Sequence, residues 1–282
     1  MSLLASKSPL YAASKSLGLL FFFLLTGLYL DSYLFLKVTE HAQWYANIVM
    51  FVVVFIVFLQ VTKRAKEQMI TAILIAIIGE YLFSIVMGMY TYRLENIPHY
   101  VPPGHALVYI AVLYFSKASS IIKFRIHLEK FFTIFILFYA SIFLIFKSDV
   151  FGFAMTAVTL LLLRNKPRER LFYLTMYITV AFLEIVGTTY LCWEWPTTAW
   201  GVFDFLPSHN PPSGISFFYF GLDLGSLWLY KQRHKLAWKR MKSIRLLKES
   251  KKVLVNWKIY FLKKLCQLRF YQQLKYTKHR RH

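Results

Sequence analysis

Two glutamates, Glu80 and Glu184, each lie near the middle of an apolar run that is long enough to cross a membrane. A transmembrane helix needs roughly 17–25 predominantly apolar residues. A charged side chain at the centre of a bilayer costs roughly 2.5–3.5 kcal/mol on insertion scales, so such residues usually face the interior of a helical bundle and mark a functional site. The sequence therefore predicts a membrane protein whose bundle encloses an acidic site.

The overall composition agrees with a chain that crosses a membrane several times. Hydrophobic residues make up 57% of the 282 residues and charged residues only 17%, which excludes one or two ordinary soluble domains. The first apolar run begins near Leu17, behind Lys7 and Lys15, and extends through Leu36 without a clear small-residue cleavage pattern. We therefore interpret this run as a retained span rather than a signal peptide.

Apolar runs of spanning length recur along the chain and predict an all-α fold, a polytopic membrane bundle of about eight transmembrane helices. The expected spans cover residues 17–36, 45–61, 69–92, 105–120, 126–147, 150–164, 171–193 and 214–231. Basic residues concentrate on alternate loops and on the C-terminal tail, and such loops usually face the cytoplasm. We expect a multi-pass protein of the bacterial inner membrane with both termini in the cytoplasm.

The two halves of the chain resemble each other. Shifting the first half by 104 residues places Arg64 on Arg168 and Glu80 on Glu184. Because each half contains four expected spans, the two copies enter the membrane in the same direction, and the expected pseudo-two-fold axis runs along the membrane normal. This arrangement predicts two parallel four-helix repeats with the glutamates facing each other across a central cavity.

Aromatic residues follow each glutamate at similar distances. Tyr90 and Tyr92 follow Glu80, and Trp193 and Trp195 follow Glu184. In each copy the outer loop then closes on a Pro-Pro pair before the next expected span. Agreement between rare residues favours a duplication over a chance similarity of apolar segments.

The repeats and the charge distribution divide the chain into three parts. We expect a first four-helix repeat over residues 1–120, a second over residues 121–231, and a basic amphipathic cytoplasmic tail over residues 232–282. Cys192 and Cys266 should lie on opposite sides of the membrane, so the sequence implies neither a disulfide framework nor a cysteine metal site.

Most of the net charge of +21 belongs to the tail. Residues 231–282 contain eighteen Lys and Arg against one acid, Glu249. Apolar residues alternate with this charge, which is typical of amphipathic helices that bind anionic membrane lipids. Nucleic acid would also be attracted by the charge, but tethering to eight spans favours lipid, and we expect no nucleic-acid partner.

A third acid, Asp223, lies about nine residues into the last expected span and should join Glu80 and Glu184 near the midplane. Burial and neighbouring carboxylates can keep one acid protonated while another stays ionised, which is how a general acid and a general base coexist. The neighbouring Tyr and Trp rings offer π faces to a developing carbocation. These residues predict catalytic acids that act on a long hydrocarbon, an isoprenoid or carotenoid lipid, bound by the four aromatic side chains.

Two other interpretations of the glutamates remain open. In the first, they only fix helix packing through hydrogen bonds to the neighbouring polar side chains Tyr81, Ser84, Thr188 or Thr189. In the second, they relay protons or ions in a transporter, for which intramembrane acids and parallel repeats are equally suited. The enzyme interpretation is an isoprenoid hydratase or cyclase, and its alternative is a proton-coupled transporter or a non-catalytic lipid-handling protein.

The expected outer loops carry further polar residues that suit a metal ion or an anion. Imidazole and carboxylate ligands are present in both loops, namely Glu95, His99, His105, Glu194, Asp204 and His209. Their spacings match no known metal motif, so roles in polar loops and helix caps are the default. Arg93 is a candidate for an anionic group of the substrate, or it balances Glu95 as a surface pair. No pattern for nucleotide, haem, flavin or phosphate binding occurs, and we expect no organic cofactor.

Two stretches of about forty residues carry a family resemblance. Glu80 followed by Gly88–Tyr92 and a proline-bearing loop, and Glu184–Gly187 followed by Trp193–Trp195, resemble the bacterial membrane carotenoid-biosynthesis family, which includes carotenoid hydratases and lycopene-cyclase-like enzymes. The resemblance implies acid-catalysed water addition or ring closure on a polyene end group, with Glu80 and Glu184 as the acids. The chain departs from that pattern in its Pro-Pro-Gly-His loop ending at His105 and in its basic tail.

Overall fold

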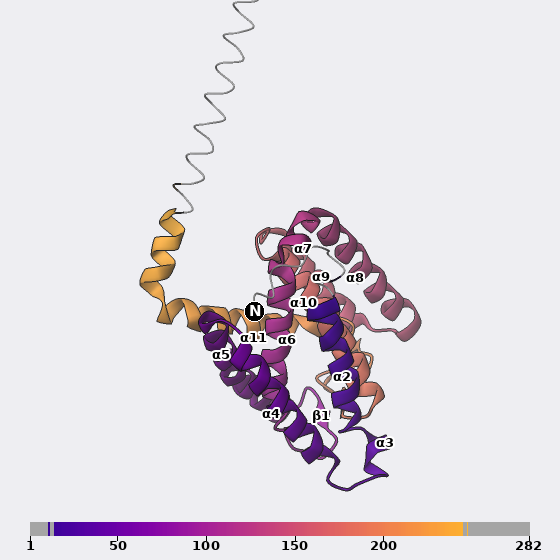
Figure 1. Cartoon of the computed structure of the whole chain (residues 1–282). Coiled ribbons are helices and arrows are strands. Elements are labelled where there is room, and N and C mark those ends of the chain that lie inside the picture. The colour runs from indigo at the N-terminus through magenta and orange to yellow at the C-terminus, as the bar shows by residue number, and fades with distance from the viewer. Residues whose placement is uncertain (1–10, 12–13, 245–246, 248–282) are drawn as a thin grey trace, which may run out of the picture. The chain divides into compact units, whose positions relative to one another are not determined.

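In the computed structural model, residue 11, residues 14–244 and residue 247 are described. Most of the described residues are helical (Figure 1). The elements in chain order are η1 (Ser14–Gly18), α2 (Leu19–Tyr29), α3 (Tyr33–Leu36), α4 (Ala42–Gln60), α5 (Lys63–Glu80), η2 (Tyr81–Val86), β1 (Thr91–Tyr92), α6 (Val101–Lys117), α7 (Ser119–Lys123), α8 (Arg125–Lys147), α9 (Val150–Arg164), α10 (Arg170–Thr189), β2 (Trp193–Glu194), β3 (Thr198–Ala199), β4 (Phe203–Pro207) and α11 (Ser216–Arg233). Elements η1 and η2 are π-helical.

Four helices of the described part are long and apolar enough to cross a membrane. They are α4, α5 together with η2, α8 and α10. Two shorter apolar helices cover Ser14–Tyr29 and Val150–Arg164. Each of the eight segments expected from the sequence contains a helix. The chain is thus a mainly helical protein with several helices suited to a membrane.

The first expected span, residues 17–36, is not one continuous helix. Helix α2 ends at Tyr29, and the hydroxyl of Ser32 starts the short α3 by accepting a hydrogen bond from the Phe35 N–H at 3.1 Å. Asp31 lies between the two helices with its side chain buried. The expectation was wrong because it followed apolar composition through an N-cap serine, which ends one helical segment and begins another.

The helices that carry the two glutamates also end earlier than expected. Helix α5 continues beyond Glu80 only as the π-helical turn η2, and Gly88 then adopts a φ of +57°. Helix α10 ends at Thr189, and Leu191 adopts a φ of +56°. Such left-handed residues turn the chain away from the helix axis. The aromatic residues after each helix therefore belong to loops and not to membrane-spanning helices.

Short strands, which the sequence analysis does not predict, connect these two loops. Strand β1 pairs antiparallel with β2, with Thr91 opposite Glu194 and Tyr92 opposite Trp193. A second antiparallel pair joins β3 and β4. The first pair matters for the site, since it links the chain segments that follow α5 and α10 although they are about a hundred residues apart.

Helices α6 and α10 lie at the centre of the bundle. Helix α6 packs against α5, α4 and α10, and α10 packs also against α8, α2 and α9 (Figure 1). Of the most apolar 18-residue stretch of α10, 72% is buried inside the protein, whereas only 11% of the corresponding stretch of α8 is buried. The outward face of α8 is rich in exposed phenylalanine and isoleucine, which suits contact with lipid tails.

The chain divides into two units, Met1–Tyr230 and Lys231–His282. The first contains the bundle. In the second, residues 235–244 are helical. The lipid-binding tail expected over residues 232–282 falls largely on positions 245–246 and 248–282, and these lie outside the described residues, as does Cys266.

Candidate functional site

Glu80 and Glu184 line one cavity inside the bundle. Both residues are only 3% exposed. The wall of the cavity is mostly apolar and aromatic, with residues from α2, α4, α6, α10 and α11. Its open space is about 70 Å³, which admits a few water molecules or a small part of a larger ligand.

The Glu80 carboxylate accepts hydrogen bonds from two tyrosines and contacts a histidine. The hydroxyls of Tyr90 and Tyr92 donate to Oε2 at 2.6 and 2.7 Å. The other oxygen, Oε1, lies 2.9 Å from Nε2 of His105. His105 comes from the first turn of α6, just after the Pro-Pro pair. A ring nitrogen of histidine donates or accepts according to its tautomer, so a proton can reside on either member of the Glu80–His105 pair.

The Glu184 carboxylate has three donors in a matching arrangement. The indole N–H groups of Trp193 and Trp195 donate to Oε2 at 2.8 and 3.0 Å. The hydroxyl of Tyr219, on α11, donates to Oε1 at 3.0 Å. Because an indole nitrogen can only donate, the oxygen between the two tryptophans is an acceptor.

The aromatic partners of one glutamate pack against those of the other. Tilted and edge contacts join the loop aromatics, and the histidine stacks on the α11 tyrosine at an interplanar angle of 25°. The ring-centroid distances are 4.5 Å for Tyr90–Trp195, 6.1 Å for Tyr92–Trp193 and 4.8 Å for His105–Tyr219. The two carboxylates thus share one continuous aromatic lining.

Local backbone features place these rings. The pairing of β1 with β2 sets Tyr92 opposite Trp193. On α10, the absence of a side chain at Gly187 leaves the space that the Trp193 indole occupies, since a Cβ there would overlap that ring. The sequence Glu184–Gly187 followed by Trp193 therefore has a steric reason: the glycine lets the indole reach the carboxylate from the loop.

Burial raises the pKa of each of the Tyr90 and Tyr92 hydroxyls well above its usual range, and the neighbouring Glu80 carboxylate raises both pKa values further. Both phenols therefore stay protonated and remain donors at any physiological pH. They hold a carboxylate in place without losing a proton themselves.

Asp223 does not line this cavity. It lies four residues after Tyr219 on α11, about 6 Å further along a helix axis, and it lines a separate pocket. The expectation that Asp223 joins Glu80 and Glu184 is therefore wrong, because Asp223 borders a different pocket. Helix α11 presents Tyr219, and not Asp223, at the level of the Glu184 carboxylate.

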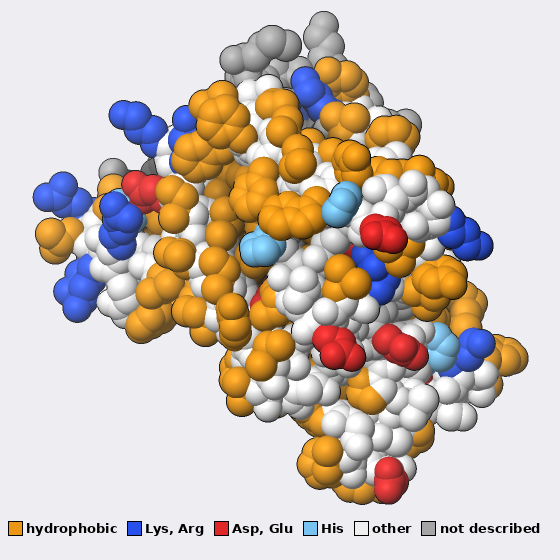
Figure 2. Space-filling model, turned by 90° about the horizontal axis from the view of Figure 1, so that it is seen from below, with side chains coloured by type: hydrophobic (Ala, Val, Ile, Leu, Met, Phe, Trp, Pro, Cys, Tyr) orange, Lys and Arg blue, Asp and Glu red, His pale blue; other side chains and the backbone are white. Residues whose placement is uncertain are grey.

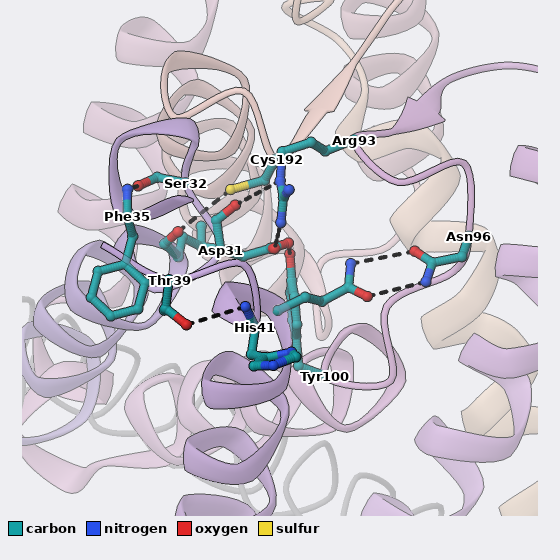
Figure 3. A network of polar contacts seen from close by, with 11 residues as sticks. Asp31, Ser32, Phe35, Thr39, His41, Arg93, Asn96, Tyr100 and Cys192 are labelled. Carbon is teal, nitrogen blue, oxygen red and sulfur yellow. Dashed lines mark hydrogen bonds and ion pairs between the residues drawn. The ribbon is translucent and has the colours of Figure 1, made fainter. Parts of the chain in front are cut away.

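Arg93 is engaged inside the protein rather than open to a substrate anion. Its Nη2 lies 2.5 Å from Oδ1 of Asp31, whose side chain is fully buried, and its Nε donates to the Asp31 carbonyl at 3.1 Å. The Tyr100 hydroxyl donates to the second carboxylate oxygen at 2.8 Å. Figure 3 shows Arg93 pointing at Asp31 from the loop after β1, with Cys192 beside it. The alternative pairing with Glu95 is also wrong, because Asp31 is the partner.

Burial raises the pKa of the Asp31 carboxyl, while the hydrogen bonds from Arg93 and Tyr100 act in the opposite direction. The charge on Asp31 thus depends on these two partners. Burial likewise raises the pKa of the Cys192 thiol, whose Sγ lies 3.5 Å from the Leu28 carbonyl. A thiol that stays protonated is a poor nucleophile, so Cys192 has a packing role.

The candidate metal ligands do not converge. His99 stacks on Trp44 at 6.0 Å, His209 packs its ring against Phe143, and Glu194 is exposed on β2. Figure 2 shows acidic side chains and histidines scattered over the end of the molecule that lies at the bottom of Figure 1. Among the described residues, no group of three or more His, Cys, Asp or Glu side chains is placed to hold a metal ion.

Helix-packing partners near the glutamates also differ from those considered above. The Ser84 hydroxyl donates to the Tyr90 carbonyl, the Thr188 hydroxyl donates to the backbone carbonyl of Glu184, and Tyr81 is 59% exposed. The side-chain contacts of both carboxylates described above are with loop and neighbouring-helix residues instead.

Two partners of the carboxylates were not recognised from the sequence. The sequence does not single out Tyr219, because it is one of several aromatics in the apolar start of α11. His105 was considered only as a metal ligand. Its position directly after a Pro-Pro-Gly helix start, which orients the first turn of α6, was the available signal.

No family model matches this chain, and neither a curated protein nor a solved structure matches it.

Proposed function

We propose that the protein is an integral membrane enzyme that performs acid–base chemistry, hydration or ring closure, on an isoprenoid or carotenoid lipid. One observation carries the proposal: Glu80 and Glu184 line the same buried cavity, each with three polar side-chain partners. Stabilising helix contacts would not require two buried carboxylates at one cavity, since such groups are costly in an apolar surrounding.

The partners of the two carboxylates suit opposite roles in proton transfer. The Glu80–His105 pair, with 2.9 Å between its closest atoms, can hold a transferable proton and acts as the general acid. The Glu184 oxygen between Trp193 and Trp195 receives only donors, so this carboxylate stabilises positive charge and accepts a proton. Two carboxyl groups in different surroundings can act in this way, one as the proton donor and the other as the proton acceptor.

The proposed reaction begins with transfer of the proton from the Glu80–His105 pair to one carbon of an alkene, which leaves a carbocation on the adjacent carbon. In ring closure, a second double bond of the same chain attacks this cation, and the Glu184 carboxylate removes a proton from the carbon next to the new cation. In hydration, water attacks, and its extra proton goes to Glu184. Ring closure is a net isomerisation, and hydration adds one water molecule. The aromatic rings stabilise the cation.

A groove beside the cavity suits the remaining hydrocarbon of such a substrate. It has about 430 Å³ of open space and a mostly apolar wall built from α2, α4 and α6. Phe23 lines both the groove and the cavity. The small cavity would hold the reacting end group, and the chain would extend along the groove past Leu107 and Ile110 of α6.

The same proposal includes eight spans in two parallel four-helix repeats, with α2, α4, α5 and α6 equivalent to α8, α9, α10 and α11. Its support is that equivalent elements supply equivalent groups: the C-terminal parts of α5 and α10 carry the glutamates, and α6 and α11 each supply a further partner. A buried aspartate also follows the first helix of each half, Asp31 and Asp149.

We place the protein in the bacterial inner membrane with cytoplasmic termini, and we assign anionic lipids to the tail of residues 231–282. The basic segments Lys63–Lys66 and Arg164–Arg170 support this orientation, because both lie at the same end of the proposed repeats. The charge of the tail supports the lipid assignment.

Comparison of the lipids of cells with and without the gene tests the proposal. We expect cells that lack the gene to accumulate an isoprenoid with an unmodified end group, detected by extraction and mass spectrometry. Glu184→Gln keeps an acceptor oxygen but removes the charge, and should lower product formation about 10²–10⁴-fold, the usual share of general acid–base catalysis. Glu80→Gln should have an effect of the same order.

The matched control is Glu40→Gln, because Glu40 is an exposed glutamate outside the cavity; it should restore the product in full. An unchanged isoprenoid profile after gene deletion would overturn the enzyme proposal. Full product with redistribution between the two sides of the membrane would support the proton-coupled transporter instead.

A further inference from the structure

A second pocket lies at the opposite end of the helices that carry the glutamates. It has about 300 Å³ of open space and is bordered by α5, α6, α7, α8, α10 and α11. Four basic residues line it: Arg64, Lys117, Arg125 and Arg168. This concentration of basic side chains around one pocket is not used by the proposed reaction.

The sequence spacing separates this pocket from the glutamate cavity. Arg64 precedes Glu80 by sixteen residues, and Arg168 precedes Glu184 by the same number. Sixteen residues of helix span about 24 Å. The two pockets share no lining residue, so the basic pocket is a separate site. The 104-residue shift that relates Glu80 to Glu184 also relates Arg64 to Arg168, and both arginines line this pocket.

The basic residues differ in how far their charge is balanced. Arg125 forms an ion pair with Glu129 at 2.6 Å, and it donates to the Pro167 carbonyl. Arg64 lies over the ring of Tyr230 at 5.2 Å, a contact that leaves its charge in place. Arg64 and Lys117 carry like charges and line the same pocket, so they repel each other, and an anion between them would relieve that repulsion.

Two acids also face the pocket, Glu169 and Asp223. Neither forms a salt bridge with another described residue. The Oδ2 atom of Asp223 is buried and has no hydrogen-bond partner within the described part of the chain. A buried acceptor without a donor is costly, which indicates that a donor group from a ligand belongs beside Asp223.

We propose that this pocket binds a phosphate ester that carries a hydroxyl or ammonium donor. The phosphate oxygens accept hydrogen bonds from Arg64, Lys117 and Arg168, and the donor group bonds to Asp223. Planar guanidinium groups match phosphate geometry through paired N–H donors. A phospholipid head group and a free phosphate ester both present this chemistry.

The binding experiment uses the purified full chain in detergent with two soluble probes, inorganic phosphate and glycerol 3-phosphate. Binding is measured by isothermal titration calorimetry. The Arg64→Gln/Arg168→Gln variant should bind either probe at least tenfold more weakly. Asp223→Asn should weaken binding of glycerol 3-phosphate, which has hydroxyl donors, and leave binding of inorganic phosphate unchanged.

Lys130→Gln is the matched control, because Lys130 is an exposed cation on α8 outside the pocket; it should bind both probes as the unchanged protein does. If the double glutamine variant fails to fold, Arg64→Lys/Arg168→Lys keeps the charges and removes only the paired donors, and it should still weaken binding severalfold. Equal affinity of the unchanged protein and the folded arginine variants would overturn the proposal.

A second arm separates the two sources of the phosphate. The protein is placed in nanodiscs of phosphatidylcholine with or without phosphatidylglycerol, and retained lipid is counted by native mass spectrometry. Retention of phosphatidylglycerol that falls in the double variant supports a lipid head group, and binding of the soluble probes alone supports a free ester. Absence of both kinds of binding would overturn the proposed phosphate site. It would not bear on the proposed glutamate-dependent reaction, because that reaction is tested separately by the lipid products of the cells.

Discussion

At the scale of single residues, the buried carboxylates of the bundle differ by their partners. Asp31 has a cationic partner, Arg93. Asp149 accepts hydrogen bonds from backbone N–H groups, including those of Gly152 and Ser213 at 3.1 and 2.7 Å. Each of these aspartates fixes a chain segment, because its oxygens are bonded to groups of a distant loop. Of these four carboxylates, only those of Glu80 and Glu184 line the aromatic cavity, and this distinction separates structural acids from the candidate catalytic ones.

Asp31→Asn should destabilise the protein by about 3–5 kcal/mol, the usual cost of removing one member of a buried ion pair. The change leaves the Arg93 guanidinium, whose side chain is 9% exposed, without a counter-charge. Chemical unfolding in detergent micelles, followed by circular dichroism, measures the free energy of unfolding.

The double variant Asp31→Asn/Arg93→Met serves as the control. It removes both charges at once, so it should recover much of the stability lost in Asp31→Asn, because no uncompensated charge remains buried. Equal stability of Asp31→Asn and the unchanged protein would contradict the role of this pair in joining the α2–α3 segment to the loop after β1.

The sequence predicted six of the residues that line the cavity, Glu80, Glu184, Tyr90, Tyr92, Trp193 and Trp195, because intramembrane acids and repeated aromatics are rare patterns. It did not predict Tyr219 as a partner or the position of Asp223. Depth along a span can be counted from the sequence, but the direction of a side chain around the helix depends on which helices pack beside it. Arg93 illustrates the same limit, since its partner lies 62 residues away in the chain.

At the scale of elements, the site depends on where helices α5 and α10 end. Apolar composition continues past both ends, so the sequence favoured longer spans over residues 69–92 and 171–193. The structure ends them with a π-helical turn after Glu80 and with left-handed residues at Gly88 and Leu191. Helix ends are set by such local turns and by tertiary pairing of β1 with β2, and composition alone contains little information about either.

Gly187→Ala should disturb the α10 end of the site. The added methyl would overlap the Trp193 indole, which is held by Glu184 and packed against Tyr92. Overpacking of this kind typically costs about 1–3 kcal/mol. We expect a lower free energy of unfolding and a shifted tryptophan emission spectrum, both measured in detergent.

Gly221→Ala on α11 is the matched control, since no atom of the described structure lies within 4 Å of its added Cβ. A helical Gly→Ala change without a clash should stabilise by about 0.5–1 kcal/mol. If both alanine variants had the same effect on unfolding and emission, the close approach of Trp193 to α10 would not be needed for the site.

At the scale of the whole molecule, the two halves of the bundle meet at two pockets, the glutamate cavity and the basic pocket. Glu80 and Glu184 line one, and Arg64 and Arg168 line the other. A pseudo-two-fold axis along the membrane normal brings equivalent residues together at every depth, so one duplication would produce an acidic site near one face and a basic site near the other. This arrangement requires equivalent loops to lie on the same side of the membrane.

Single cysteines in a cysteine-free background test that requirement. Lys37 and Val202 are exposed in loops proposed to face outwards, and Lys63, at the start of α5, and Lys166 are exposed in segments proposed to face the cytoplasm. With a membrane-impermeant maleimide on intact cells, we expect labelling of cysteine at positions 37 and 202 only, and of all four positions after permeabilisation. Labelling of positions 63 and 166 from opposite sides would exclude parallel repeats. It would also remove the physical reason for equivalent residues to meet, because copies of opposite orientation would place Arg64 and Arg168 at different faces.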